Sequence, residues 1–186
     1  MVLDILNQFD FFSKVPLSGS ASYSEIAHAT KLPELIIRRV LRYAFTMRFF
    51  APDPADSDRV MHTALSAHAA RTPLLRSWIG HAIEEARPAS TKTAEALRRF
   101  SGGLENPTEE MDETAFGLSW PPLKDGRRAD FWSVGEDDPN EKWRANRFAD
   151  AMQASVLTAV KDAGHAVDNF DWESLGKATV VDVSSS

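Results

Sequence analysis

The sequence predicts a mainly α-helical protein that contains one small β-hairpin and ends in a single strand. Three observations support this fold class. Apolar residues recur at helical spacing over most of the chain. Two short segments around the polar loop "DPADSD" have the composition of a hairpin. The β-branched run of Thr179, Val180 and Val181 near the C-terminal end is typical of a strand.

The composition is that of an ordinary soluble globular domain. The chain has 186 residues, of which 43% are hydrophobic and 26% are charged. It has no apolar run of the roughly 20 residues that cross a bilayer, no secretory signal and no cysteine. These features predict a cytoplasmic protein without membrane contact. The formal net charge of −6 argues against nucleic-acid binding.

The first 72 residues are expected to form one module. Residues 2–13 read as an amphipathic helix, and the capping box "SYSE" opens a short helix that reaches Thr30. Pro33 then opens a longer helix, because proline is favoured at a first helical position. Its apolar stripe is expected to comprise Leu35, Ile36, Val40, Leu41 and Ala44. Helices followed by the hairpin "RFFAP…RVMHT" resemble a winged helix.

Residues 73–170 are expected to form a second, helical region. A helical pattern runs from Pro73 to Phe100, and Pro88 is expected to kink or divide it. Residues 101–140 read mostly as loop or short helix. The clearest helix covers 141–162, and its expected buried face comprises Phe148, Ala151, Met152, Ser155, Val156, Ala159 and Val160.

Residues 171–186 contain the expected terminal strand, at 178–183. A strand that leads into a tight turn is how a dinucleotide-binding domain begins, and that turn is normally rich in glycine. Here Ser184, Ser185 and Ser186 follow the strand. Side chains at these positions crowd the space that a ligand needs.

The segments "DETAFGLSW", "RFADAMQ" and "DWESLGKATVVDV", in this order, resemble the N-terminal half of fungal and plant-type small-molecule O-methyltransferases. The resemblance covers nearly the whole chain. It implies a winged-helix-like dimerisation region at 1–72 and a helical substrate wall at 73–170. It also implies that 171–186 begins a truncated Rossmann-like domain, which in the family binds S-adenosylmethionine. The implied partners are a second copy of the chain or a full-length methyltransferase relative.

The serine turn departs from the family pattern, and no later part of the cofactor site follows it. We therefore expect no bound cofactor and no methyl transfer by this chain alone. The apolar first helix, "VLDILNQFDFF", adds a reason to expect a homodimer, since it would expose too much apolar surface on a monomer.

The candidate site residues combine one histidine with a set of aromatic residues. His81 lies on a helix whose family counterpart lines the substrate cavity, so it is either a structural residue or a catalytic residue that shuttles a proton. The candidate substrate-binding residues, which could equally be core residues, are Trp78, Phe116, Trp120, Phe131, Trp132, Phe148 and Met152. The five histidines lack the spacing of a metal-binding helix, so no metal site is expected.

Three functional hypotheses follow. The first is a methyltransferase-family protein of natural-product metabolism that has lost its cofactor domain and binds an aromatic or polyketide-like molecule, or a partner subunit. The second is a cofactor-independent cyclase, dehydratase or isomerase that uses the same cavity. The third is the N-terminal fragment of an active O-methyltransferase.

Overall fold

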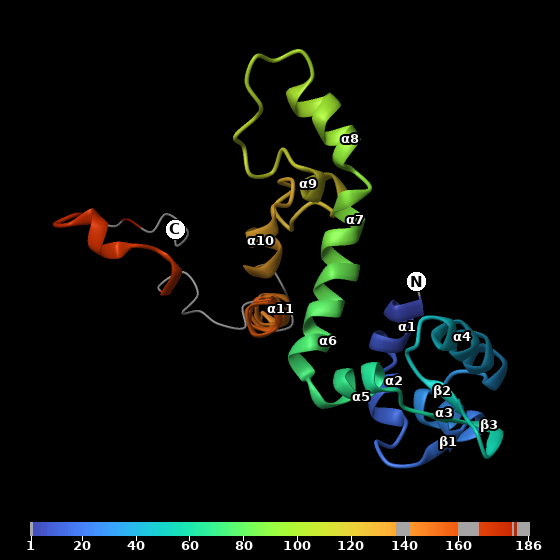
Figure 1. Ribbon diagram of the computed structural model, residues 1–186. Coiled ribbons are helices and arrows are strands. Elements are labelled where there is room, and N and C mark those ends of the chain that lie inside the picture. The colour runs from blue at the N-terminus through green and yellow to red at the C-terminus, as the bar shows by residue number, and fades with distance from the viewer. Residues whose placement is uncertain (1, 137–141, 160–167, 180, 182–186) are drawn as a thin grey trace.

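The computed structural model of the protein describes residues 2–136, 142–159, 168–179 and 181 (Figure 1). Most of these residues are helical. Within them, the sheet has three short antiparallel strands in the order β1-β3-β2. The prediction of a mainly α-helical fold is therefore confirmed. None of the described helices is long and apolar enough to cross a membrane.

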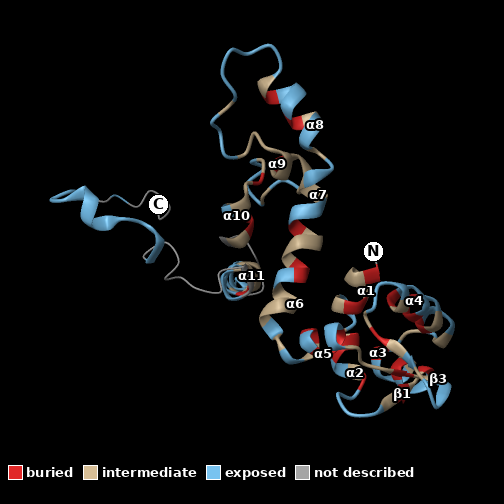
Figure 2. Cartoon of the chain, in the orientation of Figure 1, coloured by how far each residue is buried: buried red, intermediate tan, exposed pale blue. Residues whose placement is uncertain are grey.

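The N-terminal module surrounds a compact hydrophobic core, and buried residues concentrate there (Figure 2). Leu6, Phe11, Ile26 and Leu41 have no exposed surface in this core. The elements of the module are α1 (Val2–Gln8), α2 (Phe11–Lys14), β1 (Ser20–Ser22), α3 (Tyr23–Thr30), α4 (Glu34–Thr46), β2 (Ala51–Asp53), β3 (Asp56–Met61) and α5 (Ala64–Arg71).

The sequence signals for local structure hold in most of this module. The hydroxyl of Ser22 accepts a hydrogen bond from the amide of Glu25 at 3.1 Å, and the Glu25 carboxylate accepts from the Ser22 amide at 2.6 Å, which is the expected capping box. The predicted hairpin is present as β2 and β3. Strand β1 was not predicted, because three residues are too short to show an alternating pattern.

Two details of the first helices differ from the expectation. The single helix expected over 2–13 is divided at Asp10, which adopts a left-handed φ of 50°. The apolar side chains of α1 and α2 are buried in the core of their own chain, with Val2 at 8% exposure and Phe12 at 1%. The apolar first helix is thus no reason to expect a dimer, because a short helix can bury this face within its own module.

The stripe expected on α4 is shifted by one position. Ile37, Val40, Leu41 and Ala44 are buried, whereas Leu35 is 62% exposed and Ile36 is 39% exposed. Around the helix, Leu35 lies about 200° and Ile36 about 100° from Ile37, so they turn away from the core and Ile37 takes the place nearest to it.

The second region begins with a helical rod. It consists of α6 (Pro73–Gly80), the π-helical segment η1 (His81–Ala86) and α7 (Arg87–Ser90), and these are followed by α8 (Thr93–Ala96) and the π-helical segment η2 (Leu97–Ser101). Pro88 does not divide the rod, because α6, η1 and α7 follow one another without a gap and form one continuous helical ribbon (Figure 1). The turn before it is widened instead, and the amide of Arg87 donates to the carbonyl of Ala82, five residues earlier.

Three helices pack beside this rod: α9 (Ala115–Ser119), α10 (Phe131–Glu136) and α11 (Trp143–Ala159). The buried residues of α11 include Ala151 and Ala154, as helical spacing requires. Met152 and Val156, which were expected on the buried face, are 39% and 55% exposed. Ala151 and Ala154 occupy the buried positions instead, on a helix that packs against α6. Val160 lies outside the described residues.

The C-terminal segment does not show the expected strand in its described part. Ala178, Thr179 and Val181 are not in a strand, and the remaining residues of 178–183 lie outside the described residues. Val181 is 72% exposed. Among the described residues, the strands β1, β2 and β3 pair with one another in the N-terminal module and none pairs with residues 178, 179 or 181. Residues 172–175 form the short 3₁₀ helix η3 (Trp172–Leu175).

His62 provides a pH-dependent contribution to the stability of the module. Its Nε2 lies 3.0 Å from the carbonyl of Val15, and its Nδ1 lies 2.9 Å from the hydroxyl of Ser66. Since the carbonyl can only accept, Nε2 carries the proton and Nδ1 accepts from Ser66. Burial, and secondarily the charge of Arg71, hold the pKa of His62 below its ordinary value of 6.5.

The neutral imidazole is therefore the form that the fold prefers. The resulting stability is present above pH 6.5 and is lost as the pH falls through the lowered pKa of the folded protein. We expect the free energy of unfolding, measured in urea, to decrease between pH 7.5 and pH 5. The decrease should be shallower for His62→Gln. His28 is exposed on α3, so His28→Gln should keep the wild-type slope. An unchanged slope in His62→Gln would contradict the assignment.

Candidate functional site

An aromatic cluster lies where α9, α10 and α11 meet the rod, and Phe131 is at its centre. The ring centroid of Phe131 lies 4.9 Å from that of Phe148, 5.1 Å from that of Trp132 and 5.5 Å from that of Phe116. All three contacts are edge-to-face, the arrangement that aromatic quadrupoles favour. Trp120 stacks on Phe116 at 5.3 Å with only 8° between the ring planes.

The position of α9 depends on a glycine. A Cβ atom at Gly117 would lie 2.2 Å from the carbonyl oxygen of Asp112 and 2.8 Å from that of Ala129, so no side chain fits there. The helix also begins at a capped residue, since the Thr114 hydroxyl accepts from the Gly117 amide at 3.1 Å. These two constraints fix the direction of Phe116.

A pocket of about 210 Å³ opens within this cluster. Most of its wall is apolar, and the polar side chains in the wall belong to Glu85 and Arg144. The lining residues are Glu85, Phe116, Phe131, Trp132, Val134, Gly135, Arg144, Ala145 and Phe148. A concave apolar site with a few convergent polar groups is the usual form of a small-molecule site.

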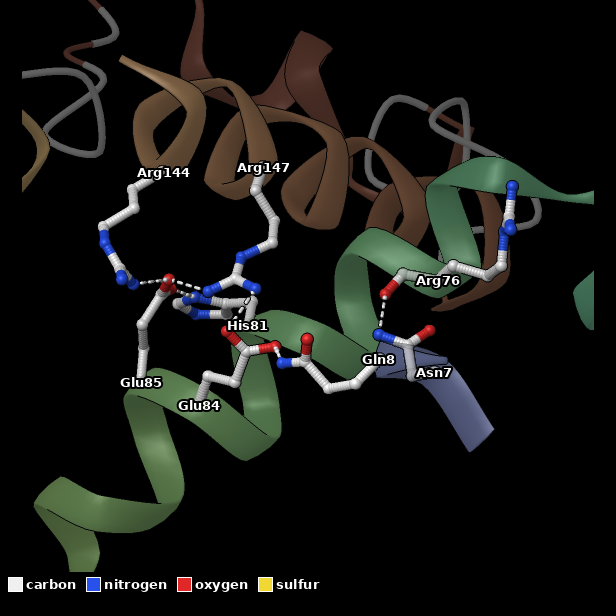
Figure 3. A network of polar contacts seen from close by, with 8 residues as sticks. All are labelled: Asn7, Gln8, Arg76, His81, Glu84, Glu85, Arg144 and Arg147. Atoms are coloured by element: carbon white, nitrogen blue, oxygen red, sulfur yellow. Dashed lines mark hydrogen bonds and ion pairs between the residues drawn. The ribbon is translucent and has the colours of Figure 1, made fainter. Parts of the chain in front are cut away.

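Glu85 is the buried anion at the base of the site, with 4% exposure (Figure 3). The imidazole of His81 donates from Nδ1 to its Oε2 at 2.5 Å. Its Oε1 accepts from the guanidinium of Arg147 and, at 3.4 Å, from that of Arg144. Both arginines come from α11, so these ion pairs fix the rotation of α11 against the rod.

The polar network continues to the N-terminal module. Arg147 also pairs with Glu84 at 2.8 Å, and Glu84 accepts a hydrogen bond from the amide group of Gln8 on α1. Gly80 makes room for this arginine, because a Cβ atom there would lie 3.0 Å from a guanidinium nitrogen of Arg147. The network thus connects α1, η1 and α11.

Arg144 contacts two indole rings. Its guanidinium carbon is 4.9 Å from the ring centroid of Trp120 and 4.3 Å from that of Trp143. This stacking is a cation–π arrangement that holds the guanidinium beside the pocket. The N–H groups at the edge of the guanidinium still reach Glu85.

The structure brings together most of the residues that the sequence suggested. Phe116, Phe131, Trp132 and Phe148 line the pocket, and Trp120 stacks behind Phe116. His81 does not line the pocket. Its ring packs against Phe131 at 5.9 Å and Phe148 at 5.3 Å, and it reaches the pocket through Glu85. The remaining two, Trp78 and Met152, are 43% and 39% exposed and are not part of the wall.

Sequence reasoning missed Glu85, Arg144 and Arg147. A signal for Glu85 was present, because it is an acidic residue four positions after His81 on an otherwise apolar helical pattern. Arg144, Arg147 and Phe148 share one face of α11 at helical spacing, which places cations beside an aromatic anchor. Neither signal reveals that these two helices meet.

The described residues do not fit an S-adenosylmethionine site. Such a site needs a parallel strand, a glycine-rich turn and a following helix. Within the described ranges the sheet is the antiparallel β1-β3-β2 sheet of the N-terminal module, and Ser184–Ser186 lie outside these ranges. No group of three or more metal-ligating side chains is found in the part of the chain that the structure describes.

Comparison with known proteins identifies relatives by sequence, although no protein-family model matches. The chain is 33% identical to "O-methyltransferase lcsG" of Purpureocillium lilacinum, a match that covers 99% of this chain and 40% of that protein. It is 32% identical to "O-methyltransferase aunD" of Aspergillus niger, over 97% of this chain and 39% of that protein. The chain therefore spans about 40% of the length of these relatives.

Solved structures share the fold at lower identity. The structure of the mitomycin 7-O-methyltransferase MmcR matches with a TM-score of 0.64 and 18% identity, over 94% of this chain and 44% of that one. A structure described as "A Pericyclic Reaction enzyme" matches with a TM-score of 0.59 and 17% identity, over 81% of this chain and 36% of that one.

Removing Arg147 should destabilise the protein, because it would leave the buried Glu85 with weaker compensation. We expect Arg147→Met to lower the free energy of unfolding by about 3 kcal/mol, the cost typical of breaking one side of a buried ion pair. Glu85→Gln in the same background should restore a large part of this loss, since it removes the uncompensated charge. The double-mutant cycle is measured by urea unfolding.

The control is Arg38→Met. Arg38 pairs with Glu34 and Asp58 on the surface, with 39% of its side chain exposed, so its loss should cost only about 0–1 kcal/mol. Equal costs at Arg147 and Arg38, or no recovery in the double variant, would show that the Glu85 network does not carry the stability assigned to it.

Proposed function

Because the chain belongs by sequence to the fungal O-methyltransferase family, we propose that it binds a small aromatic molecule in the pocket between η1, α9, α10 and α11. In this proposal residues 73–170 form the substrate wall of an enzyme of natural-product metabolism. The observation that carries it is the pocket itself, a largely apolar, aromatic-lined cavity that contains one ion pair.

The size and lining of the pocket favour a flat aromatic ligand. An apolar cavity of about 150 Å³ holds a benzene molecule in other proteins, and this pocket measures about 210 Å³. One ring or a small fused pair therefore fits as the cavity stands. Phe131, Trp132 and Phe148 offer ring faces and edges against which such a ligand can pack.

The polar groups favour a ligand that carries a hydroxyl or carbonyl group. The Glu85 carboxylate accepts hydrogen bonds and the Arg144 guanidinium donates them, and both border the cavity. In a largely apolar cavity these contacts are strengthened by the low local dielectric. His81 acts through Glu85 in this proposal. It holds the carboxylate in place and does not touch the ligand, so the earlier hypothesis of a catalytic His81 becomes one of a positioning residue.

Two alternative reactions are proposed. The first is methyl transfer to the bound molecule by the whole protein, in which these residues bind and orient the acceptor. S-adenosylmethionine supplies the methyl group in that chemistry, and no described residue is assigned to it. The second is a rearrangement or cyclisation without methyl transfer, for which the ion pair in an apolar cavity offers preorganised electrostatics. The shared fold with a pericyclic enzyme makes this second candidate worth testing.

The N-terminal module is proposed to be a winged-helix-type dimerisation region. The order α2, β1, α3, α4 and then the hairpin of β2 and β3 supports the assignment. Apolar side chains that remain exposed along α4 offer a contact surface in place of the buried first helix. They are Leu35, Ile36, Tyr43 and Met47, with exposed fractions of 62%, 39%, 57% and 39%.

The pocket proposal predicts specific binding of 2-naphthol. We expect isothermal titration calorimetry to detect binding, and Phe148→Ala to weaken it at least tenfold, because about 1.4 kcal/mol of ring packing corresponds to that factor. Cyclohexanol, which has a hydroxyl but no aromatic face, should bind more weakly than phenol.

The matched control for this experiment is Met152→Ala. Met152 lies one turn further along α11 but outside the pocket wall, so its truncation should leave the affinity within a factor of two. Absence of 2-naphthol and phenol binding to the wild-type protein, or equal losses for the two variants, would refute the aromatic pocket.

The dimer proposal predicts a mass near twice 20.6 kDa in light scattering at micromolar concentration. Ile36→Lys combined with Tyr43→Lys should shift the mass to that of the monomer, because two charges would be forced into an apolar contact. Leu104→Lys is the control, since Leu104 is also exposed, at 61%, but lies far from α4 in the chain. A monomeric wild-type protein would refute the proposal.

A further inference from the structure

We propose that Pro88 is a positioning residue for the pocket: by excluding a regular α-helix, it keeps η1 in the π-helical form that presents Glu85 to the cavity. Pro88 does not line the pocket itself. The inference rests on the proposed function only for its ligand-binding measurement, since its structural measurement is independent of any ligand.

Pro88 restricts the backbone of the rod. In a regular α-helix the amide of residue 88 would donate to the carbonyl of Glu84. Proline has no N–H group, and its ring collides with the carbonyl four residues earlier. The structure avoids this collision with a wide turn, in which the amide of Arg87 donates to the carbonyl of Ala82. The wide turn closes over one more residue than an α-helical turn and ends directly before Pro88. The rod then continues as α7.

The wide turn changes where the side chains of η1 point. In an α-helix, neighbouring residues diverge by about 100° and do not face one partner. Here the adjacent Glu84 and Glu85 both reach the guanidinium of Arg147. Each π-helical residue turns through a smaller angle than an α-helical one, which brings neighbouring carboxylates closer to a common direction. Figure 3 shows the two carboxylates on the side of the rod that faces α11.

The same geometry aligns His81 with Glu85. The two residues are four positions apart, and in a wide turn this spacing is nearly one full revolution. The imidazole therefore lies directly beside the carboxylate, with 2.5 Å between Nδ1 and Oε2. With 3.6 residues per turn, the two residues would still share one helix face, but Glu85 would lie about 40° beyond His81 instead of just short of it, and its carboxylate would turn away from the arginines. Preserving the π-helical turn thus preserves the polar wall of the pocket.

The test is Pro88→Ala in the intact chain. Alanine permits a regular helix and is the best helix former, but the displaced Glu85 carboxylate loses part of its compensation, so the protein should stay folded with a melting temperature no lower than that of Arg147→Met. The affinity for 2-naphthol, measured by calorimetry, should nevertheless fall at least fivefold. The proton on His81 Nδ1, observed by NMR as a low-field resonance, should move to the position that it takes in Glu85→Gln. Loss of binding and a moved resonance in a protein that is still folded separate positioning from a general structural role.

Pro73→Ala is the matched control. Pro73 is at the first position of α6, where proline fits without a wide turn, so this variant should keep both the resonance and the affinity. If Pro88→Ala retains the wild-type His81 resonance, the positioning role is wrong whatever happens to binding. A melting temperature below that of Arg147→Met with loss of both signals would also overturn it, since Pro88 would then act on folding. If wild-type protein binds no 2-naphthol, the proposed function fails, while the His81 resonance still decides this inference.

Discussion

The buried carboxylate of Glu85 is the constraint on which the second half of the structure depends. A carboxylate with 4% exposure has lost most of its hydration, and this loss must be offset by cations and hydrogen-bond donors. His81 is supplied by the same π-helical segment, whereas Arg144 and Arg147 come from α11. Satisfying one charge therefore determines which face of α11 meets the rod. That choice brings Phe148 into the aromatic cluster and turns Met152 toward solvent.

The aromatic wall and the polar wall are consequences of the same packing. Phe131 contacts Phe116, Trp132 and Phe148, which come from three different helices, so the cavity exists only when all three are in place. Close backbone contact at Gly117 holds α9 against its neighbours, and the ion pairs of Glu85 hold α11. The pocket is thus bordered by packed aromatic rings on one side and by a satisfied ion-pair network on the other.

The sequence predicted the features that depend on residues close together in the chain. It predicted less well the contacts between helices that are distant in the chain. The Ser22–Glu25 capping box and the hairpin after α4 were predicted because each depends on neighbouring residues. The aromatic cluster was predicted as a set, because its residues are concentrated in one half of the chain. Glu85 was missed, since its burial depends on arginines about 60 positions away. The π-helical turn before Pro88 was also missed. A single proline in a helical pattern can be accommodated by a kink or by a widened turn, and the local sequence does not distinguish the two.

The N-terminal core and the aromatic cluster do not share buried residues: the core extends from Val2 to Ala69, with Leu75 packed on its edge. The link between them includes the contact of α1 with α6 and the hydrogen bond from Gln8 to Glu84. Such an arrangement lets one part open while the other stays folded, because cooperativity follows contiguous buried contacts. Amide hydrogen exchange should therefore resolve two units, with slower exchange in α4 than in α10. A binding site on the less protected unit can open for ligand entry at a lower free-energy cost than global unfolding.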